Sequence, residues 1–195
     1  MGARNRVHAF AVLGDLPQDK RAGDEPTRVE IGDDNVFREH VTVHRGTRRS
    51  FTKIGSNNLF MVGSHVAHDC VVGSHCTIAN GVQLAGHVVV EDYVTFGGLA
   101  GVAQFVRIGE SAFVAAGAMV ERDVPPFCIA AGDRARVRAV NRVGLERRGV
   151  PSASIAEIDR VFRAVFLSRA PRAEALAKVA TSDPFAARLL DALRK

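Results

Sequence analysis

A period of six residues runs through most of this chain. Starting at Ile54, every sixth position as far as Val120 carries a large apolar side chain. These positions are Ile54, Phe60, Val66, Val72, Ile78, Leu84, Val90, Phe96, Val102, Ile108, Val114 and Val120. Because 47% of the residues are hydrophobic, chance would produce such an unbroken run roughly once in several thousand trials. The period therefore indicates a repeated structural unit.

A period of six fits neither an α-helix, which repeats every 3.6 residues, nor a hairpin strand, which repeats every two. It is typical of a hexapeptide repeat, in which each six residues form one short strand and one corner, and three such sides close a triangular coil. Four residues after each large apolar residue the side chain is small or β-branched, as the narrow interior of such a coil requires; these are Ser64, Cys70, Cys76, Val82, Val88, Val94, Ala100, Val106, Ala112 and Ala118. We predict a mainly β fold, with a parallel β-helix over residues 1–133 and a small C-terminal α-helical region over 134–195.

The six-residue frame is interrupted twice near the N-terminus. Segment 14–28 reads as a loop, and segment 45–53 reads as a smaller insertion. At the other end, Pro125 and Pro126 cannot donate hydrogen bonds to a strand ladder, so we expect the coils to stop near Val120. About three short helices should follow; their sequence signals are a capping box of Ser154 and Glu157, Pro171 in a first turn, and a helix start at 181–184.

Composition narrows the class of protein further. The chain has 195 residues, 24% of them charged, which is typical of a globular protein and excludes disorder and collagen. It has neither an apolar run long enough to span a bilayer nor an N-terminal secretory signal, so we expect a cytoplasmic protein. Cys70, Cys76 and Cys128 have no partner at metal-finger spacing, and we interpret them as buried thiols.

Positive charge is concentrated after the repeat. Six arginines and one acidic residue lie between Arg134 and Arg148, which matches the whole net charge of +5. The stretch has no interleaved aromatic residues, which argues against a nucleic-acid partner. A diphosphate, a phosphopantetheine carrier and an anionic membrane surface remain open as partners, as does a simple solvated face.

Five of the seven histidines lie in or beside the repeat: His44, His65, His68, His75 and His87. A coil needs about 18 residues, so His68 and His87 should lie at the same corner of successive coils. Such a cluster suits a zinc site, a general base, or polar filling of exposed turns. Asp69 directly follows His68, and an adjacent carboxylate that orients an imidazole favours proton transfer.

Several longer strings resemble the UDP-N-acetylglucosamine O-acyltransferase family of lipid A biosynthesis. They are 25–32 (EPTRVEIG), 43–47 (VHRGT), 65–70 (HVAHDC), 84–87 (LAGH), 104–105 (QF) and 144–149 (GLERRG). The resemblance runs from about Asn5 to Gly149 and implies a left-handed β-helix that assembles as a homotrimer. It also implies transfer of an (R)-3-hydroxyacyl chain from acyl carrier protein to the 3-hydroxyl of UDP-GlcNAc, with no metal and no cofactor beyond the carrier thioester.

The resemblance implies roles for particular residues. His68 would be the general base, Asp69 its support, and the Gly86 N–H the donor to the oxyanion. Residues implied to hold the sugar or the nucleotide are Gln18, Asp19, Arg21, His65, His87, Gln104, Asn141, Arg147 and Arg148. Ala115 and Ala116 fall where the family lines its acyl groove.

The chain departs from the family pattern at two residues and at its beginning. Ala103 stands where the family usually has histidine, and Arg21 where it usually has lysine. The chain also starts where family members are already several coils along. Two alternatives therefore stay open: a paralogue that acylates another UDP-sugar, including a 3-amino sugar, and a non-catalytic trimer that binds a UDP-sugar or acyl carrier protein.

Overall fold

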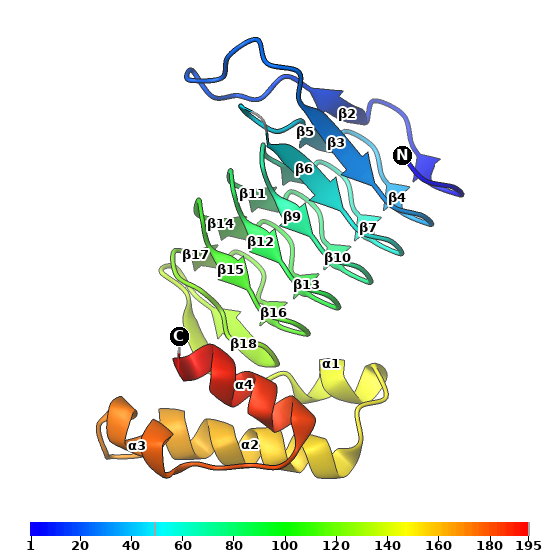
Figure 1. Cartoon of the computed structure of the whole chain (residues 1–195). Helices are drawn as coiled ribbons and strands as arrows, with labels where there is room; N and C mark the ends of the chain where they lie inside the picture. Colours follow the sequence, from blue (N-terminus) through cyan, green and yellow to red (C-terminus); the bar gives the residue numbers. More distant parts are fainter. Residues whose placement is uncertain (49, 195) are drawn as a thin grey trace.

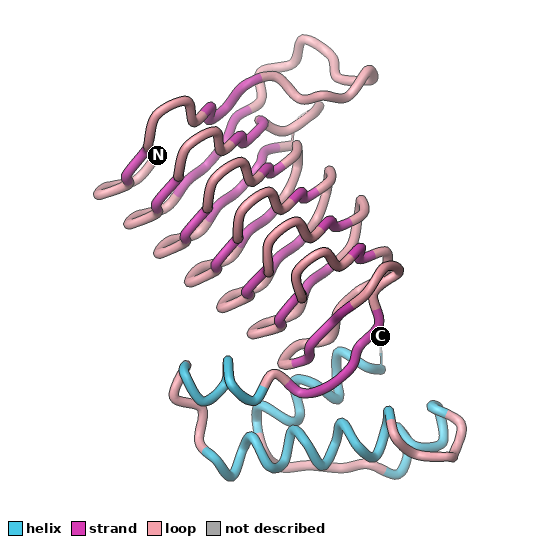
Figure 2. Tube along the Cα trace, turned by 180° about the vertical axis from the view of Figure 1, so that it is seen from behind, coloured by secondary structure: helices cyan, strands magenta, loops and turns pink. Residues whose placement is uncertain are grey.

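Short parallel strands stack into a three-sided coil with helices packed at one end (Figures 1 and 2). This architecture comes from a computed structural model that describes residues 1–48 and 50–194. Successive strands along the chain enter sheets A, B and C in turn, so each strand pairs with the strand about one coil later. Thr77 lies opposite Thr95 and Gln83 opposite Gly101, which confirms a coil of 18 residues. The parallel β-helix predicted from the six-residue period is confirmed, and its hand is left.

Sheet A contains β1 (Arg6–Val7), β4 (Val36–Phe37), β7 (Leu59–Phe60), β10 (Thr77–Ile78), β13 (Thr95–Phe96), β16 (Phe113–Val114), β18 (Cys128–Ala131) and β19 (Arg136–Val140). Sheet B contains β2 (Val12–Asp15), β5 (Thr42–His44), β8 (His65–Val66), β11 (Gln83–Leu84), β14 (Gly101–Val102) and β17 (Met119–Val120). Sheet C contains β3 (Arg28–Ile31), β6 (Phe51–Ile54), β9 (Val71–Val72), β12 (Val89–Val90) and β15 (Arg107–Ile108). The corners form three lengthwise edges, which we name the AB, BC and CA edges after the sheets they join.

The interior of the coil is filled by the residues that define the period. All twelve large apolar residues from Ile54 to Val120 are buried, and so are the small residues four positions later. The Phe37 and Phe60 rings stack at 4.9 Å between centroids, so the column continues from coil to coil. The three cysteines are buried and free, as predicted, and burial raises the pKa of each thiol to about 12.

Both interruptions of the frame lie at the BC edge. Residues 16–27 connect β2 to β3 as the long loop at the N-terminal end in Figure 1, and the second interruption lies between β5 and β6. The second interruption ends earlier than predicted, because Lys53 already belongs to β6 and pairs with Val71. The prediction that the coils stop near Val120 is wrong. Val124 bridges Ile108, and β18 pairs with β16 beyond the two prolines.

The C-terminal part begins with β19, which pairs antiparallel with β18, and the residues described after it form four helices. The helices are α1 (Arg142–Arg147), α2 (Ser152–Phe166), α3 (Arg172–Lys178) and α4 (Pro184–Arg194). Their apolar faces form a second core. The predicted helix start at 181–184 is confirmed, because Asp183 accepts a hydrogen bond from the Ala186 N–H at the head of α4. The predicted capping box is wrong, since α2 starts at Ser152 and the Ser154 hydroxyl donates to Asp183.

Candidate active site

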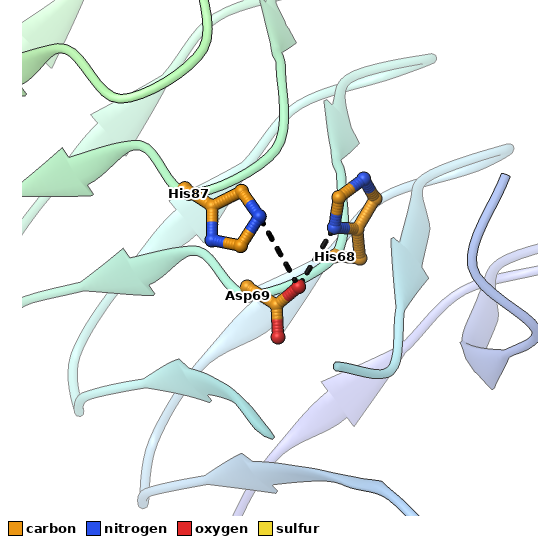
Figure 3. A group of neighbouring side chains, drawn as sticks. All are labelled: His68, Asp69 and His87. Carbon is orange, nitrogen blue, oxygen red and sulfur yellow. Dashed lines mark hydrogen bonds and ion pairs between the residues drawn. The ribbon is translucent and has the colours of Figure 1, made fainter. Parts of the chain in front are cut away.

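Two histidines and one aspartate meet at the BC edge. His68 and Asp69 form the corner between β8 and β9, and His87 lies at the same corner one coil later (Figure 3). The His68 Nδ1 atom is 2.8 Å from Asp69 Oδ2, and the His87 Nε2 atom is 3.6 Å from the same oxygen. The two imidazole rings lie edge to face, with centroids 5.2 Å apart. The sequence prediction that these histidines share a corner is confirmed.

The corner conformation explains why these residue types lie here. Asp69 has φ = 61° and His87 has φ = 63°, in the left-handed region, which asparagine, aspartate and histidine enter more readily than most residues. Phe105 has the same conformation on the next coil, and its ring stacks on His87 at 4.6 Å. Equivalent side chains therefore form a column along the BC edge.

Asp69 is held as a carboxylate. Burial acts to raise its pKa, but hydrogen bonds from Thr47 and His68 outweigh burial and hold the pKa below its ordinary value. A carboxylate beside His68 Nδ1 favours the tautomer with the proton on that nitrogen. The Nε2 atom of His68 then carries a free lone pair, which is what a general base needs.

Gly86 lies against the other side of the His68 ring. A Cβ atom at this position would be 2.7 Å from His68 Nε2 and 2.5 Å from Cε1. Within the described residues the Gly86 N–H donates to no acceptor, so it is available to an incoming oxyanion. Because Gly86 has no side chain and its N–H is free, there is room beside the candidate base for a substrate oxygen that accepts a hydrogen bond.

His65 and His44 extend the cluster one step away from the corner. His65 Nδ1 is 2.7 Å from Thr42 Oγ1, and its ring meets the His44 ring edge to face at 4.8 Å. Burial lowers the pKa of both imidazoles, with further lowering from the positive charge of neighbouring histidines. Both are therefore neutral at neutral pH and suited to hydrogen bonding.

One ligand atom each from His68, Asp69 and His87 lies within 4.8 Å of the others, a spacing that a transition metal ion accepts. Asp69 Oδ2 already receives hydrogen bonds from His68 and from the Thr47 hydroxyl. His68 and Asp69 thus form a hydrogen-bonded pair of the kind that can transfer a proton. The expectation that no metal takes part stays a prediction.

A groove of about 570 Å³ runs along sheet B and includes His65 in its lining. Its lining is His65, Gln83, Leu84, Ala85, Gly101, Val102, Ala103, Met119, Val120, Glu121 and Asp133. Ala103 and Gln104 lie at the BC edge between β14 and β15, and both are exposed. Ala115 and Ala116 lie at the AB edge, beyond the lining of the groove, so their contact with an acyl chain stays a prediction.

The loop of residues 16–27 contributes Gln18, Asp19 and Arg21 at the same BC edge. The Arg21 backbone N–H donates to the Asp19 carboxylate at 2.9 Å, and its guanidinium lies 3.3 Å from it. These two hydrogen bonds lower the pKa of Asp19, and the nearby His68 lowers it further. The loop therefore brings a carboxylate near the histidine cluster, while Gln18 and Arg21 are exposed.

Asn141, Arg147 and Arg148 lie elsewhere, below the CA edge. The Asn141 side chain caps α1 at Gly144 and donates to the Ser111 carbonyl at 2.9 Å. Arg148 donates to Ser111 Oγ at 2.8 Å, pairs with Glu110, and its guanidinium carbon lies 3.9 Å from the centre of the Tyr93 ring. Arg147 is exposed. A single chain therefore does not bring these residues to the His68 cluster.

Two hydroxyl groups that support Asp69 were not predicted from the sequence. Thr47 contacts the Asp69 carboxylate, and Thr52 accepts a hydrogen bond from the Asp69 N–H at 2.9 Å. Both lie in the interruption at 45–53, and Thr47 also ends the resembling string 43–47, but neither pattern shows that their hydroxyls contact Asp69.

Comparisons with known proteins place these features in context. A family model described as "Udp N-acetylglucosamine O-acyltransferase; Domain 2" matches residues 123–195, and a model of the bacterial transferase hexapeptide matches residues 51–86. An acyl-[acyl-carrier-protein]–UDP-N-acetylglucosamine O-acyltransferase of Alkalilimnicola ehrlichii is 50% identical over 82% of this chain. A protein of the same name from Gloeothece citriformis is 42% identical over 100% of this chain. The chain spans 62% of the first relative's length and 72% of the second's.

Solved structures agree with the sequence relatives. The UDP-N-acetylglucosamine acyltransferase of Arabidopsis superimposes with a TM-score of 0.94 at 34% identity, covering 97% of this chain and 70% of that one. The Bacteroides fragilis enzyme gives the same TM-score at 33% identity, covering 100% of this chain and 78% of that one. The likeness covers both the coil and the C-terminal helices.

Proposed function

This chain belongs to the UDP-N-acetylglucosamine O-acyltransferase family, and on that premise we propose that it transfers an acyl group from an acyl carrier protein thioester to a hydroxyl of UDP-GlcNAc. The observation that carries the proposal is the His68–Asp69 pair beside Gly86. A thioester is already activated, so transfer needs a base, an oxyanion donor and alignment.

The reaction follows from the positions of these groups. His68 Nε2 takes the proton of the sugar 3-hydroxyl as its oxygen attacks the thioester carbonyl carbon. The carbonyl π electrons move to oxygen, and the Gly86 N–H donates to the resulting oxyanion. When the oxyanion collapses, the C–S bond breaks, the proton passes from His68 to the leaving thiolate, and an ester and a free carrier thiol remain. Asp69 keeps His68 oriented in both steps and stabilises its positive charge.

The groove along sheet B supports an elongated apolar substrate. It begins at His65 and reaches Met119, and its walls are mostly small or apolar. The (R)-3-hydroxyacyl group expected from the family resemblance has this shape. The exposed arginines Arg134, Arg136 and Arg147 add positive charge that suits the anionic carrier and the nucleotide diphosphate.

We further propose a homotrimer in which one chain supplies the BC edge and a neighbour supplies α1. The separation of Asn141 and Arg147 from His68 within one chain supports this arrangement. Within the described residues, no helix is long and apolar enough to cross a membrane. The cytoplasmic location and the nature of the carrier stay predictions.

The direct test is turnover of UDP-GlcNAc with 3-hydroxyacyl carrier proteins of several chain lengths, followed by mass spectrometry. We expect an ester that is absent with a His68→Ala variant and unaffected by a chelator. Loss of activity with the chelator would instead favour the metal interpretation of the His68, Asp69 and His87 cluster. Binding of UDP-GlcNAc or carrier without turnover would favour the non-catalytic trimer.

Ala103 favours a second acceptor as an alternative. It lines the groove beside the cluster, where the family usually has a histidine, and so offers a methyl group in place of a hydrogen-bonding ring. A UDP-sugar with a 3-amino group would then give an amide. Mild alkali separates the two results, because it cleaves the ester product and leaves the amide intact.

A further inference from the structure

The smaller interruption of the six-residue frame folds onto the candidate active site. Residues 45–48 and 50 lie where other coils have a tight corner at the BC edge. A Cβ atom on Gly46 would lie 2.6 Å from the Phe51 backbone, so only glycine allows the loop to return this closely to β6. The Ser50 N–H donates to the Thr47 carbonyl at 2.9 Å and closes the turn. Thr47 is thereby fixed at the tip that faces the next coil.

Thr47 donates hydrogen bonds to both carboxylate oxygens of Asp69. Its backbone N–H donates to Oδ1 at 2.9 Å, and its hydroxyl donates to Oδ2 at 2.6 Å. The Asp69 side chain is only 2% exposed, so water has little access to replace these contacts. Oδ2 is also the atom that accepts from His68 Nδ1. A hydrogen bond to Thr47 therefore determines where that oxygen lies relative to the imidazole.

We propose that Thr47 is a positioning residue for acyl transfer, because it fixes the Asp69 carboxylate that orients His68 with Nε2 toward the substrate. In its kinetic readout this inference rests on the proposed function. The frame interruption thus has a role, because it places Thr47 where its N–H and its hydroxyl both reach the Asp69 carboxylate. Thr52, in β6, supports the same corner because its hydroxyl accepts a hydrogen bond from the Asp69 N–H.

The proposed role of Thr47 depends on its hydrogen bonds and not on its packing, so matched variants can test it. Thr47→Val keeps the shape and the backbone donor and removes only the hydroxyl, whereas Thr47→Ser keeps the hydroxyl. Thr77→Val makes the same change on sheet A, away from the cluster, and serves as the control. All three are compared with the full-length parent chain at equal concentration.

We expect Thr47→Val to lower kcat by about ten- to a hundredfold with little change in KM for the nucleotide sugar, since a hydrogen bond to a charged group is lost. Without the hydroxyl the pKa of Asp69 should rise, because one of the hydrogen bonds that lower it is lost. His68 and His87 are the other titratable groups that contact the carboxylate, and both remain in the variant. Thr47→Ser and Thr77→Val should behave like the parent.

A second readout does not need turnover. Long-range proton–nitrogen NMR spectra of histidine-labelled protein, assigned with His68→Ala, report which ring nitrogen of His68 carries the proton. We expect the Nδ1-protonated form in the parent and in Thr47→Ser, and a mixture of forms in Thr47→Val.

The outcomes are distinct. Unchanged kcat and an unchanged His68 tautomer in Thr47→Val would overturn the inference, as would equal losses in Thr47→Val and Thr47→Ser or in Thr47→Val and Thr77→Val. If the parent chain shows no turnover, the proposed function fails, and the tautomer comparison alone then decides the role of Thr47.

Discussion

At the scale of single residues, Gly86 is a position where one added methyl group should strongly lower activity. A methyl group there would lie 2.5 Å from His68 Cε1, so the imidazole would have to turn away from Asp69. We expect Gly86→Ala to lower kcat at least a hundredfold, because base and oxyanion donor are both displaced. Gly98→Ala, whose new methyl group would lie 3.4 Å from the Asn80 carbonyl oxygen, is the matched control.

Steady-state kinetics and a thermal unfolding curve for both glycine variants provide the measurement. If Gly86→Ala turned over like the parent, the contact between Gly86 and His68 would not matter for catalysis. Loss of folding in Gly86→Ala would show instead that the corner itself, and not the ring, had been disturbed.

The buried histidines make stability depend on pH. Burial lowers the pKa of His44 and His65 in the folded chain below the ordinary 6.5, with Asp15 partly offsetting this for His44 and with His68 adding repulsion to both. The unfolded chain binds protons at these histidines more readily than the folded chain, so protonation stabilises the unfolded state relative to the folded state. The stabilising effect of the neutral rings is therefore complete above about pH 6.5 and is lost as the pH falls toward the folded pKa values.

Denaturant unfolding at fixed protein concentration, between about pH 7.5 and 5.5, measures this slope. We expect stability to fall over that range, and the fall to be shallower in His65→Gln. The exposed His40 supplies the control, since His40→Gln should leave the slope unchanged. An equal slope in all three proteins would contradict the prediction.

At the scale of elements, strands and helices differ in how far the sequence predicts them. Each six-residue unit of the coil buries one large apolar residue in its strand, so the period is visible from Ile54 to Val120 without any alignment. The last strands were missed because Pro125 and Pro126 suggested an end. In the structure the ladder passes them by using Val124 and then β18, whose pairing with β16 needs no proline N–H.

The capping box failed for a different reason. Ser154 and Glu157 have the spacing of a capping box, but both side chains form hydrogen bonds with other residues instead. Ser154 donates to Asp183 at 2.7 Å, and Glu157 contacts Arg160 and Thr181. Local spacing cannot reveal a partner that is 29 residues away. The same limit hid Thr47, whose partner Asp69 lies on the next coil.

The structure therefore predicts opposite behaviour for two serines of α2. Ser154→Ala removes a partly buried hydrogen bond to the carboxylate that also caps α4, so it should lower the free energy of unfolding by about 1–2 kcal/mol. Ser152→Ala changes an exposed residue at the first turn and should be nearly neutral. Denaturant unfolding compares the two variants. A larger loss of stability in Ser152→Ala than in Ser154→Ala would contradict a stabilising role for the Ser154–Asp183 contact.

At the scale of the whole molecule, the expected binding residues divide between two edges. The sequence predicted His68 and Arg147 as parts of one site, and nothing in a linear pattern shows on which edge of the coil each will lie. The structure gives His68 to the BC edge and places α1 beside Ser111 at the CA edge. A neighbouring copy that packs its CA edge against this BC edge would unite them.

Mixing two inactive variants tests that arrangement. His68→Ala lacks the base, and Arg147→Ala lacks an exposed cation that takes no part in the internal Arg148–Glu110 pair. Each variant alone should be nearly inactive. In trimers assembled from equal amounts of both, about a quarter of the interfaces combine an intact BC edge with an intact α1, so about a quarter of parent activity should return. Recovery requires that His68 and Arg147 act from different chains, whereas residues acting within one chain would leave the mixed trimers as inactive as either variant.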